Sequence, residues 1–173
     1  MRVRKIVYLS LVVLIASNCS VNDVSRPRLF DVTELSIGEL STAMNDGSVT
    51  SVELVDSYLA RIAAYDQRGP VLNAMITLNP SARETAAKLD EERRSGQLRG
   101  PLHGIPIVVK DNYDTVDMST TAGSIALATS RPPDDATQVR RLRDAGAVIL
   151  GKTNMHELAI GITTIASYGG QTR

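Results

Sequence analysis

The residues best suited to chemistry lie at the end of an apolar run. Residues 105–109 are Ile, Pro, Ile, Val and Val, and the polar residues Lys110, Asp111 and Asn112 follow at once. An apolar, β-branched run bounded by Gly and Pro is typical of a buried strand, and open α/β sheets carry their chemistry where strands end. Lys110 is therefore the first candidate for chemistry; the simpler alternative is a surface lysine at a strand end.

A sheet is needed to position these residues, and the following sequence supplies its pattern. A helix is predicted over residues 136–145, and a second buried strand follows over residues 147–150. Strand, helix and strand in this spacing indicate a βαβ unit, so the expected fold class is α/β. The hydroxyl-rich stretch 114–124 lies between the first strand and the helix. It offers many hydrogen-bond donors, although a turn that satisfies its own backbone is the simpler interpretation.

The N-terminal part is predicted to be mostly helical. Ser36–Glu39 and Thr50–Glu53 both match a capping box in front of an apolar periodic segment. A strand is expected over residues 72–78, and Asn79–Pro80 is expected to begin a helix that ends near Gly96. This part is therefore expected to contribute structure rather than chemistry.

One motif resembles a phosphate-binding loop in the wrong context. Residues 146–153 fit the pattern Gly-x-x-x-x-Gly-Lys-Thr. A phosphate loop needs a strand before its first glycine and a loop between the two glycines. Here a predicted helix precedes Gly146, and the residues between the glycines are themselves the predicted strand, which cannot form an anion-binding nest. We therefore exclude nucleotide binding and expect no cofactor.

The pair His156–Glu157 suggests zinc, but the rest of a zinc motif is missing. The partner histidine of such a motif falls on Ile160, and His103 is the only other histidine. Two histidines without a cysteine partner make a poor zinc site. The sequence therefore predicts no metal.

Composition narrows the choice of partners. The 173 residues carry 19 basic and 19 acidic side chains, for a formal net charge of zero. This balance gives no reason to expect nucleic acid, and with one Phe, five Tyr and no Trp the chain lacks platforms for stacking bases. Composition therefore gives no support for a nucleic-acid partner.

The N-terminus has the pattern of an export signal. Basic residues precede an apolar run, residues 6–16, that is too short to span a bilayer and suits a signal peptide. We expect residues 1–19 to be the signal and residues 20–34 a tether. Cys19, the only cysteine, stands where a bacterial lipoprotein signal carries its lipidated cysteine, although Asn18 departs from the usual small residue. The expected location is the periplasm, either free or membrane-anchored through Cys19; ordinary secretion is the alternative.

Three linked blocks closely resemble the amidase signature family. They are residues 104–112 (GIPIVVKDN), 120–124 (TTAGS) and 142–159 (LRDAGAVILGKTNMHELA). The resemblance runs from about Leu35 to Arg173 and implies the family fold, a central mixed β-sheet covered by helices. Residues 35–173 match only the N-terminal part of that fold.

The resemblance also implies a reaction and roles for several residues. Members of this family cleave carboxylic amides with a Ser-Ser-Lys triad and no metal, so the resemblance implies a small-molecule amide as substrate, and the triad lysine maps to Lys110. A lysine acts as a base only while its amine is uncharged, and burial favours that form, so the mapping implies that Lys110 is buried. By this mapping Asp111 and Asn112 hold the ammonium form and the loop in place, and residues 120–124, with Thr121 and Ser124, line the same cavity. Ala159 offers a backbone contact to the acyl pocket. Neither serine motif of the triad is matched by Ser119, Ser124 or Ser167, so the 173-residue chain alone is expected to be inactive.

Two alternatives remain open at this stage. The first is the glutaminase-type subunit of a tRNA-dependent amidotransferase, which shares the signature but works in the cytoplasm, against the N-terminal signal. The second is a truncated, non-catalytic remnant or binding protein that keeps one wall of the pocket.

Overall fold

A computed structural model describes residues 29–173 of the chain. The expected signal sequence with Cys19, and most of the expected tether 20–34, lie outside the described residues. Within residues 29–173, no helix combines the length and the apolar character that crossing a bilayer requires.

A three-stranded mixed sheet lies at the centre of the molecule. Its strands are β1 (Met75–Leu78), β2 (Pro106–Lys110) and β3 (Val148–Thr153), in the order β1-β3-β2. Strand β3 runs parallel to β2 and antiparallel to β1. The parallel pair is connected through helix α4 (Thr137–Asp144), as the expected βαβ unit requires. The α/β class with a mixed sheet is therefore confirmed.

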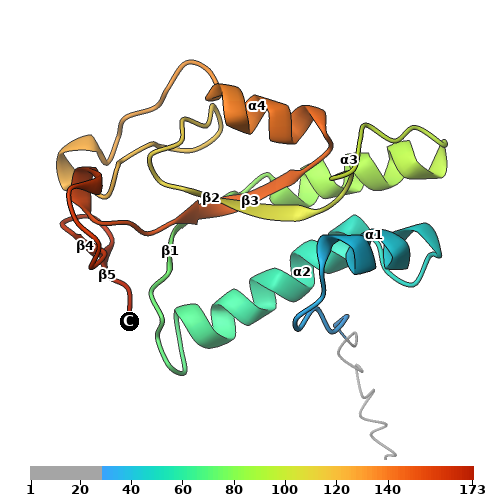
Figure 1. Cartoon of the computed structure of the whole chain (residues 1–173), viewed down its shortest axis with the longest axis horizontal. Coiled ribbons are helices and arrows are strands. Elements are labelled where there is room, and N and C mark those ends of the chain that lie inside the picture. The colour runs from blue at the N-terminus through green and yellow to red at the C-terminus, as the bar shows by residue number, and fades with distance from the viewer. Residues whose placement is uncertain (1–28) are drawn as a thin grey trace, which may run out of the picture.

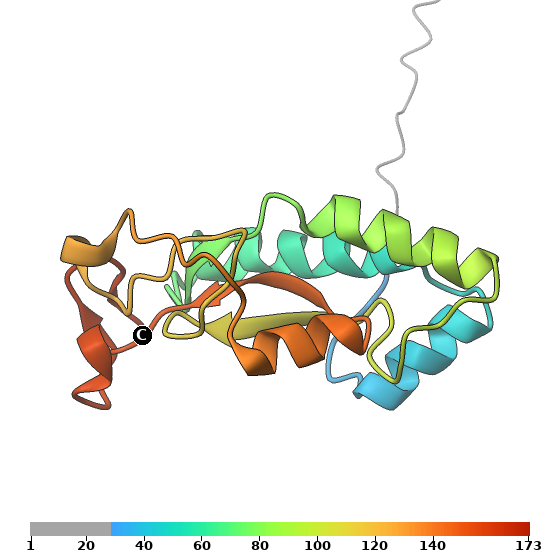
Figure 2. The ribbon, with the colours of Figure 1, turned by 90° about the horizontal axis from the view of Figure 1, so that it is seen from above.

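Helices cover both faces of this sheet (Figures 1 and 2). On one face lie α1 (Ile37–Asn45), α2 (Ser51–Arg61), which continues as a π-helical turn (Ile62–Asp66), and α3 (Ala82–Arg94). Helix α4 lies on the other face. Short elements complete the chain: the 3₁₀ turns Ile125–Leu127 and Glu157–Ala159, and the strands β4 (Ile165–Ala166) and β5 (Gly170–Gln171).

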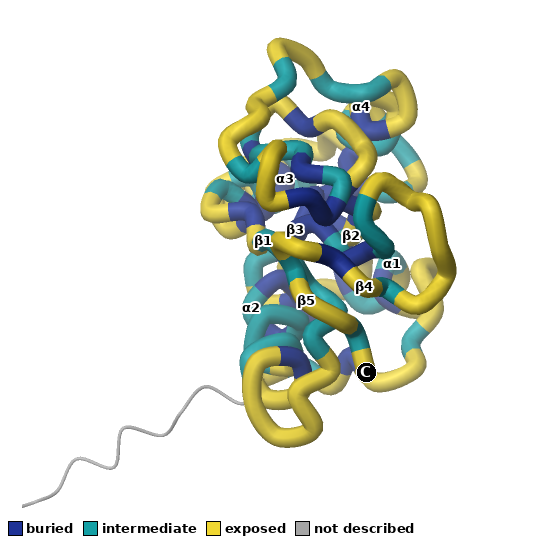
Figure 3. The backbone as a smooth tube through the Cα atoms, turned by 90° about the vertical axis from the view of Figure 1, so that its left-hand side faces the viewer, coloured by how far each residue is buried: buried dark blue, intermediate teal, exposed yellow. Residues whose placement is uncertain are grey.

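The alternation of side chains along β3 explains the two-sided core. Val148 and Leu150 pack among residues of α2 and α3, whereas Ile149 between them packs with Val139 of α4 and Met118. Successive residues of a strand point to opposite faces, so one apolar run serves both layers. Figure 3 shows the buried residues gathered along the sheet and the exposed ones in the loops and the C-terminal hairpin.

The N-termini of α1 and α2 are determined by local sequence. Both predicted capping boxes are present: the side chains of Ser36 and Thr50 accept from the backbone N–H of Glu39 and Glu53, whose carboxylates accept in return. The predicted start at Asn79–Pro80 is wrong, because α3 begins at Ala82.

Asn79 has a tertiary role that the sequence does not reveal. Its side-chain amide donates to the carbonyl of Ile149 at 2.8 Å and to Asp117 Oδ2 at 2.9 Å. Its side-chain oxygen accepts from the backbone N–H of Ser81 at 2.9 Å. Asn79 therefore connects a turn to β3 and to the loop above it, instead of capping the helix directly.

Candidate active site

Two lysines lie at the carboxyl ends of the parallel strands. The register pairs Val109 of β2 with Lys152 of β3, and Lys110 with Thr153. The ladder continues one residue further, because the Asp111 backbone N–H donates to the Thr153 carbonyl at 3.2 Å. Neighbouring parallel strands thus bring two amines and one carboxylate to the same edge of the sheet.

The expected burial of Lys110 is not found. Its side chain is exposed, as is that of Asn112, whereas Val109 before it is buried. The alternation of side chains along β2 explains this: Val108 and Lys110 point to one face of the strand and are exposed, whereas Val109 between them points to the opposite face and is buried. Among residues 29–173, no carboxylate forms an ion pair with Lys110 and no serine hydroxyl hydrogen-bonds to its amine.

Asp111 is fully buried and organises the hydroxyl-rich loop. One carboxylate oxygen, Oδ2, accepts from the backbone N–H groups of Thr121 at 3.2 Å and Gly123 at 3.3 Å, and also from the Thr121 hydroxyl. The Asp111 carbonyl accepts from Ala122 N–H at 3.1 Å. Hydrogen bonds to an ionised group are the strong ones, so this carboxylate fixes the turn at residues 121–123. Asp111 thus holds the loop, but the ammonium it faces is not that of Lys110.

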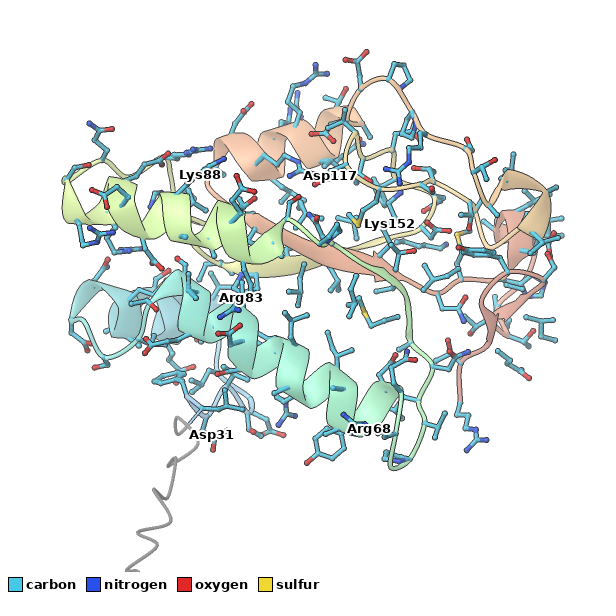
Figure 4. All side chains as sticks on the ribbon, turned by 180° about the vertical axis from the view of Figure 1, so that it is seen from behind. Asp31, Arg68, Arg83, Lys88, Asp117 and Lys152 are labelled. Atoms are coloured by element: carbon cyan, nitrogen blue, oxygen red, sulfur yellow. The ribbon has the colours of Figure 1, made fainter. Side chains whose placement is uncertain are left out.

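That ammonium belongs to Lys152, whose side chain has no exposed surface. Lys152 Nζ donates to the Tyr113 carbonyl at 2.8 Å and to Thr120 Oγ1 at 2.6 Å, and lies 3.7 Å from Asp111 Oδ1. Figure 4 shows Lys152 extending from β3 toward the loop that carries Asp117. Burial lowers the pKa of Lys152, and the negative charges of Asp111, Asp114 and Asp117 oppose part of that effect.

Lys152 is the functional candidate that sequence reasoning misses. In the sequence it stands out only as part of the apparent phosphate loop, which the structure shows as the extended strand β3. The available signal is its position in the continuation of a fully apolar strand, where a lysine needs a buried partner.

Ser124 lies at the far end of the loop, beside Glu157. Hydrogen bonds from Ser124 and from Ser167 lower the pKa of Glu157, and the Ser167 backbone N–H donates to Glu157 Oε2 at 2.9 Å. The Leu158 N–H donates to the Ala122 carbonyl at 2.8 Å. The segment around Glu157 therefore packs against the turn that Asp111 holds.

The remaining predicted residues are arranged as follows. Ala159 follows Leu158 in this segment; it is exposed, with a positive φ of 59°. The structure thus brings Asp111 and Thr121 together and places Ser124 beside them in the same loop. Lys110, Asn112 and Ala159 stand on exposed surface.

Neither histidine is part of a candidate metal site among residues 29–173. His103 is buried elsewhere, with Nε2 at 2.8 Å from the Leu89 carbonyl, and His156 Nδ1 lies 3.3 Å from Thr163 Oγ1. Within residues 29–173, no group of three or more His, Cys, Asp or Glu side chains is arranged to hold a metal ion.

Comparisons with known proteins give a consistent result. The family model described as Amidase matches residues 53–173. A glutamyl-tRNA(Gln) amidotransferase subunit from Halorhodospira halophila is 46% identical over 138 residues, which are 79% of this chain and 28% of that protein.

Solved structures agree. The native peptide amidase of Stenotrophomonas maltophilia superposes with a TM-score of 0.78 at 51% identity, covering 82% of this chain and 30% of that enzyme. An amidase family protein of Bacillus anthracis gives a TM-score of 0.76 at 39% identity, covering 82% and 29%. The chain spans less than a third of the length of each of these relatives.

Proposed function

The chain belongs to the amidase signature family, and from this premise we propose that the protein of which it forms the N-terminal part hydrolyses a carboxylic amide, with Lys110 as the base. The substrate is a small-molecule amide, and the products are a carboxylic acid and ammonia or an amine. Nucleic acid is not a partner, and neither metal nor cofactor takes part.

The proposed chemistry requires the amine of Lys110 to accept a proton. Lys110 takes a proton from a bridging serine, which takes one from the nucleophilic serine, whose oxygen attacks the amide carbonyl. The tetrahedral intermediate collapses when the C–N bond breaks and the leaving nitrogen receives the proton. Water then attacks the acyl-enzyme, with the same lysine as base, and releases the acid. Both serines belong to the part of the family fold that this chain does not match.

The single observation that best supports Lys110 as the base is that the carboxylate of Asp111 pairs with other groups and not with the Lys110 amine. A carboxylate beside an amine stabilises its ammonium form and so weakens the amine as a base. Asp111 is the next residue in the sequence, yet its carboxylate is committed to the 121–123 turn and to Lys152. Lys110 therefore stands at the strand end without an ion-pair partner among residues 29–173.

A chimera tests this proposal. Residues 29–173 replace the corresponding segment of the Stenotrophomonas maltophilia peptide amidase, which is 51% identical, and amide hydrolysis is measured as ammonia release. We expect an active chimera, and a loss of about 10²–10⁴-fold in kcat for Lys110→Met, the range for removal of a general base. Lys88→Met is the matched control, because Lys88 is an exposed lysine on α3 paired only with Glu84. Full activity in Lys110→Met would contradict the assignment.

The 173-residue chain alone is expected to release no ammonia from amides, because its serines match neither triad motif. A remnant without catalytic competence shares that expectation, so the chimera separates the two ideas. An inactive chimera that folds correctly would favour the remnant.

A second candidate function is the glutaminase subunit of a tRNA-dependent amidotransferase, favoured by the 46% identity to a subunit of such an enzyme. We place it second because we propose that residues 1–19 export the protein, with Cys19 as a lipidation site. A reporter active only outside the cytoplasm, fused after residue 25, decides between them. Export supports the amidase, whereas retention supports the amidotransferase.

A further inference from the structure

Lys152 is the largest side chain without exposed surface among the described residues. It takes no part in the proton transfers described above. A buried ammonium is costly unless it is paired and hydrogen-bonded. The residues that pair with this ammonium therefore indicate which part of the structure the buried charge stabilises.

Every polar partner of Lys152 lies on the segment that directly follows Lys110. The Tyr113 carbonyl is three residues beyond Lys110, Thr120 Oγ1 lies near the other end of the loop, and Asp111 adjoins Lys110 itself. One ammonium thus contacts both ends of the loop and the residue next to the proposed base.

The two oxygens of Asp111 divide their roles. Oδ2 accepts three hydrogen bonds, from Thr121 and Gly123, whereas Oδ1 is buried without a hydrogen bond and has the Lys152 ammonium at 3.7 Å. A buried charged oxygen without a hydrogen bond is costly, and a cation within ion-pair distance offsets part of that cost. Lys152 therefore stabilises the carboxylate on which the 121–123 turn depends.

Other charges near this pair are already engaged or lie farther away. Asp117 is bound by Arg143 at 2.9 Å, and Arg143 also pairs with Asp135 at 2.9 Å. Asp114 contributes only a weaker attraction to Lys152 than Asp111 does. Lys152 is thus the cation that Asp111 has within 4 Å among residues 29–173.

We propose that Lys152 is a positioning residue of the amidase centre: its buried ammonium pairs with Asp111 and clamps the loop 111–123, which fixes the backbone directly after Lys110 and keeps the Asp111 carboxylate away from the Lys110 amine. This proposal rests on the proposed function, in which Lys110 is the base. Small displacements of a reacting group cost rate, because catalysis depends on near-attack geometry.

The kinetic test uses the chimera described above with Lys152→Met, Asp111→Asn and the double variant, with Lys88→Met as control. Each kcat is divided by the folded fraction measured by circular dichroism. We expect Lys152→Met to lower kcat at least tenfold with KM changed less than about twofold. We expect Asp111→Asn to act similarly, and the double variant to be no worse than either single one, because the two residues act as one unit.

The double variant separates positioning from stability. Removing both charges relieves the unpaired buried carboxylate, so the double variant is expected to fold better than Lys152→Met, yet its kcat stays low. Wild-type kcat per folded molecule in Lys152→Met would overturn the proposal, because Lys152 would then serve stability alone.

A second readout needs no activity and so separates this proposal from the proposed function. Amide hydrogen exchange is measured on the 173-residue chain. In Lys152→Met we expect the Thr121 and Gly123 amides to exchange at least tenfold faster, with the amides of α2 unchanged. If the chimera with the wild-type sequence hydrolyses no amide but exchange accelerates in Lys152→Met as described, the proposed function is wrong and the role of Lys152 in holding the loop 111–123 is supported. Unchanged exchange at Thr121 and Gly123 would show that Lys152 does not hold the loop 111–123.

Discussion

The helical layer (α1, α2 and α3) and the loop region (residues 111–124 and 154–173) are held together by different forces. In the helical layer, apolar side chains such as Leu54, Val55 and Leu89 are buried almost completely against one another and the sheet. In the loop region the most deeply buried groups include Asp111, which faces the buried Lys152 of β3, and Thr121, which donates to Asp111. Apolar burial is non-directional, whereas buried polar groups must each find a partner.

Positive φ angles mark strained positions in more than one part of the described chain. In the loop region Ala122 and Leu158 have φ of 49° and 52°, and outside it Val71 and Asn73 have φ of 52° and 54°. Such angles are unfavourable for residues with a side chain and persist only where the surroundings enforce them. At Ala122 the backbone N–H donates to the Asp111 carbonyl and the carbonyl accepts from the Leu158 N–H, so hydrogen bonds hold this turn in place.

The largest expected effect comes from the helical layer. Leu54 of α2 has no exposed surface, so Leu54→Ala leaves a cavity and is expected to lower the free energy of unfolding by about 2–5 kcal/mol. The measurement is urea denaturation followed by circular dichroism. Ile37→Ala on α1 is the control, because Ile37 is 49% exposed, and it should change the value by less than about 0.5 kcal/mol. Equal effects of the two variants would contradict the assignment of Leu54 to the core.

A smaller loss is expected in the loop region from Gly123→Ala. Gly123 has a φ of +75°, and a Cβ there would lie 3.1 Å from the Ala166 Cβ and 3.2 Å from the Met155 carbonyl oxygen. We expect a loss of about 1–3 kcal/mol from backbone strain and crowding. Gly47→Ala separates the two causes, since Gly47 has a φ of +79° with nothing within 4 Å. If both variants lose the same stability in urea titrations, crowding at Gly123 contributes nothing.

The smallest expected effect is a pH dependence of stability that has opposite signs for Lys152, which pairs with the loop region, and for Tyr58 of the helical layer. Burial lowers the pKa of Lys152 below 10.5, so the unfolded chain binds more protons, and the stability deficit at this site disappears as pH rises through the folded pKa toward 10.5. Burial raises the pKa of Tyr58 of α2 above 10.0, so its contribution is full below pH 10.0 and is lost as pH rises through the folded pKa.

Urea titrations at a series of alkaline pH values check both signs. The stability of wild type relative to Lys152→Met should increase up to pH 10.5, and that relative to Tyr58→Phe should decrease above pH 10.0. Parallel pH profiles for wild type and both variants would show that neither group is linked to folding.

Sequence predicts the helical layer better than the loop region, and the reason is the range of the interactions. The capping boxes at Ser36 and Thr50 involve residues three apart, so local pattern is enough to find them. The parallel pairing of β2 and β3 follows from apolar runs flanking a helix. The prediction for Asn79 is wrong because its amide bonds to Ile149, 70 residues away.

The sequence predicts where the site lies but not which of its residues contact one another. Lys110 and the 120–124 loop can both be identified from the sequence, and the structure brings the loop to Asp111. Sequence cannot show that Asp111 faces Lys152 instead of Lys110, because that choice depends on which face of the sheet each side chain takes. The exposure of Lys110 likewise depends on which face of β2 it occupies and on what covers that face, which no local pattern encodes.

The central position of β3 has a practical consequence for proteolysis. Lys152 is paired with Thr77 on one side and with Val109 on the other, and trypsin must draw the chain around a bond into its own cleft as an extended segment. Cleavage after Lys88, which is exposed on α3, requires only local opening, whereas cleavage after Lys152 requires the middle of the sheet to come apart. The rate at which a tryptic fragment ending at Lys152 appears therefore measures complete opening of the molecule.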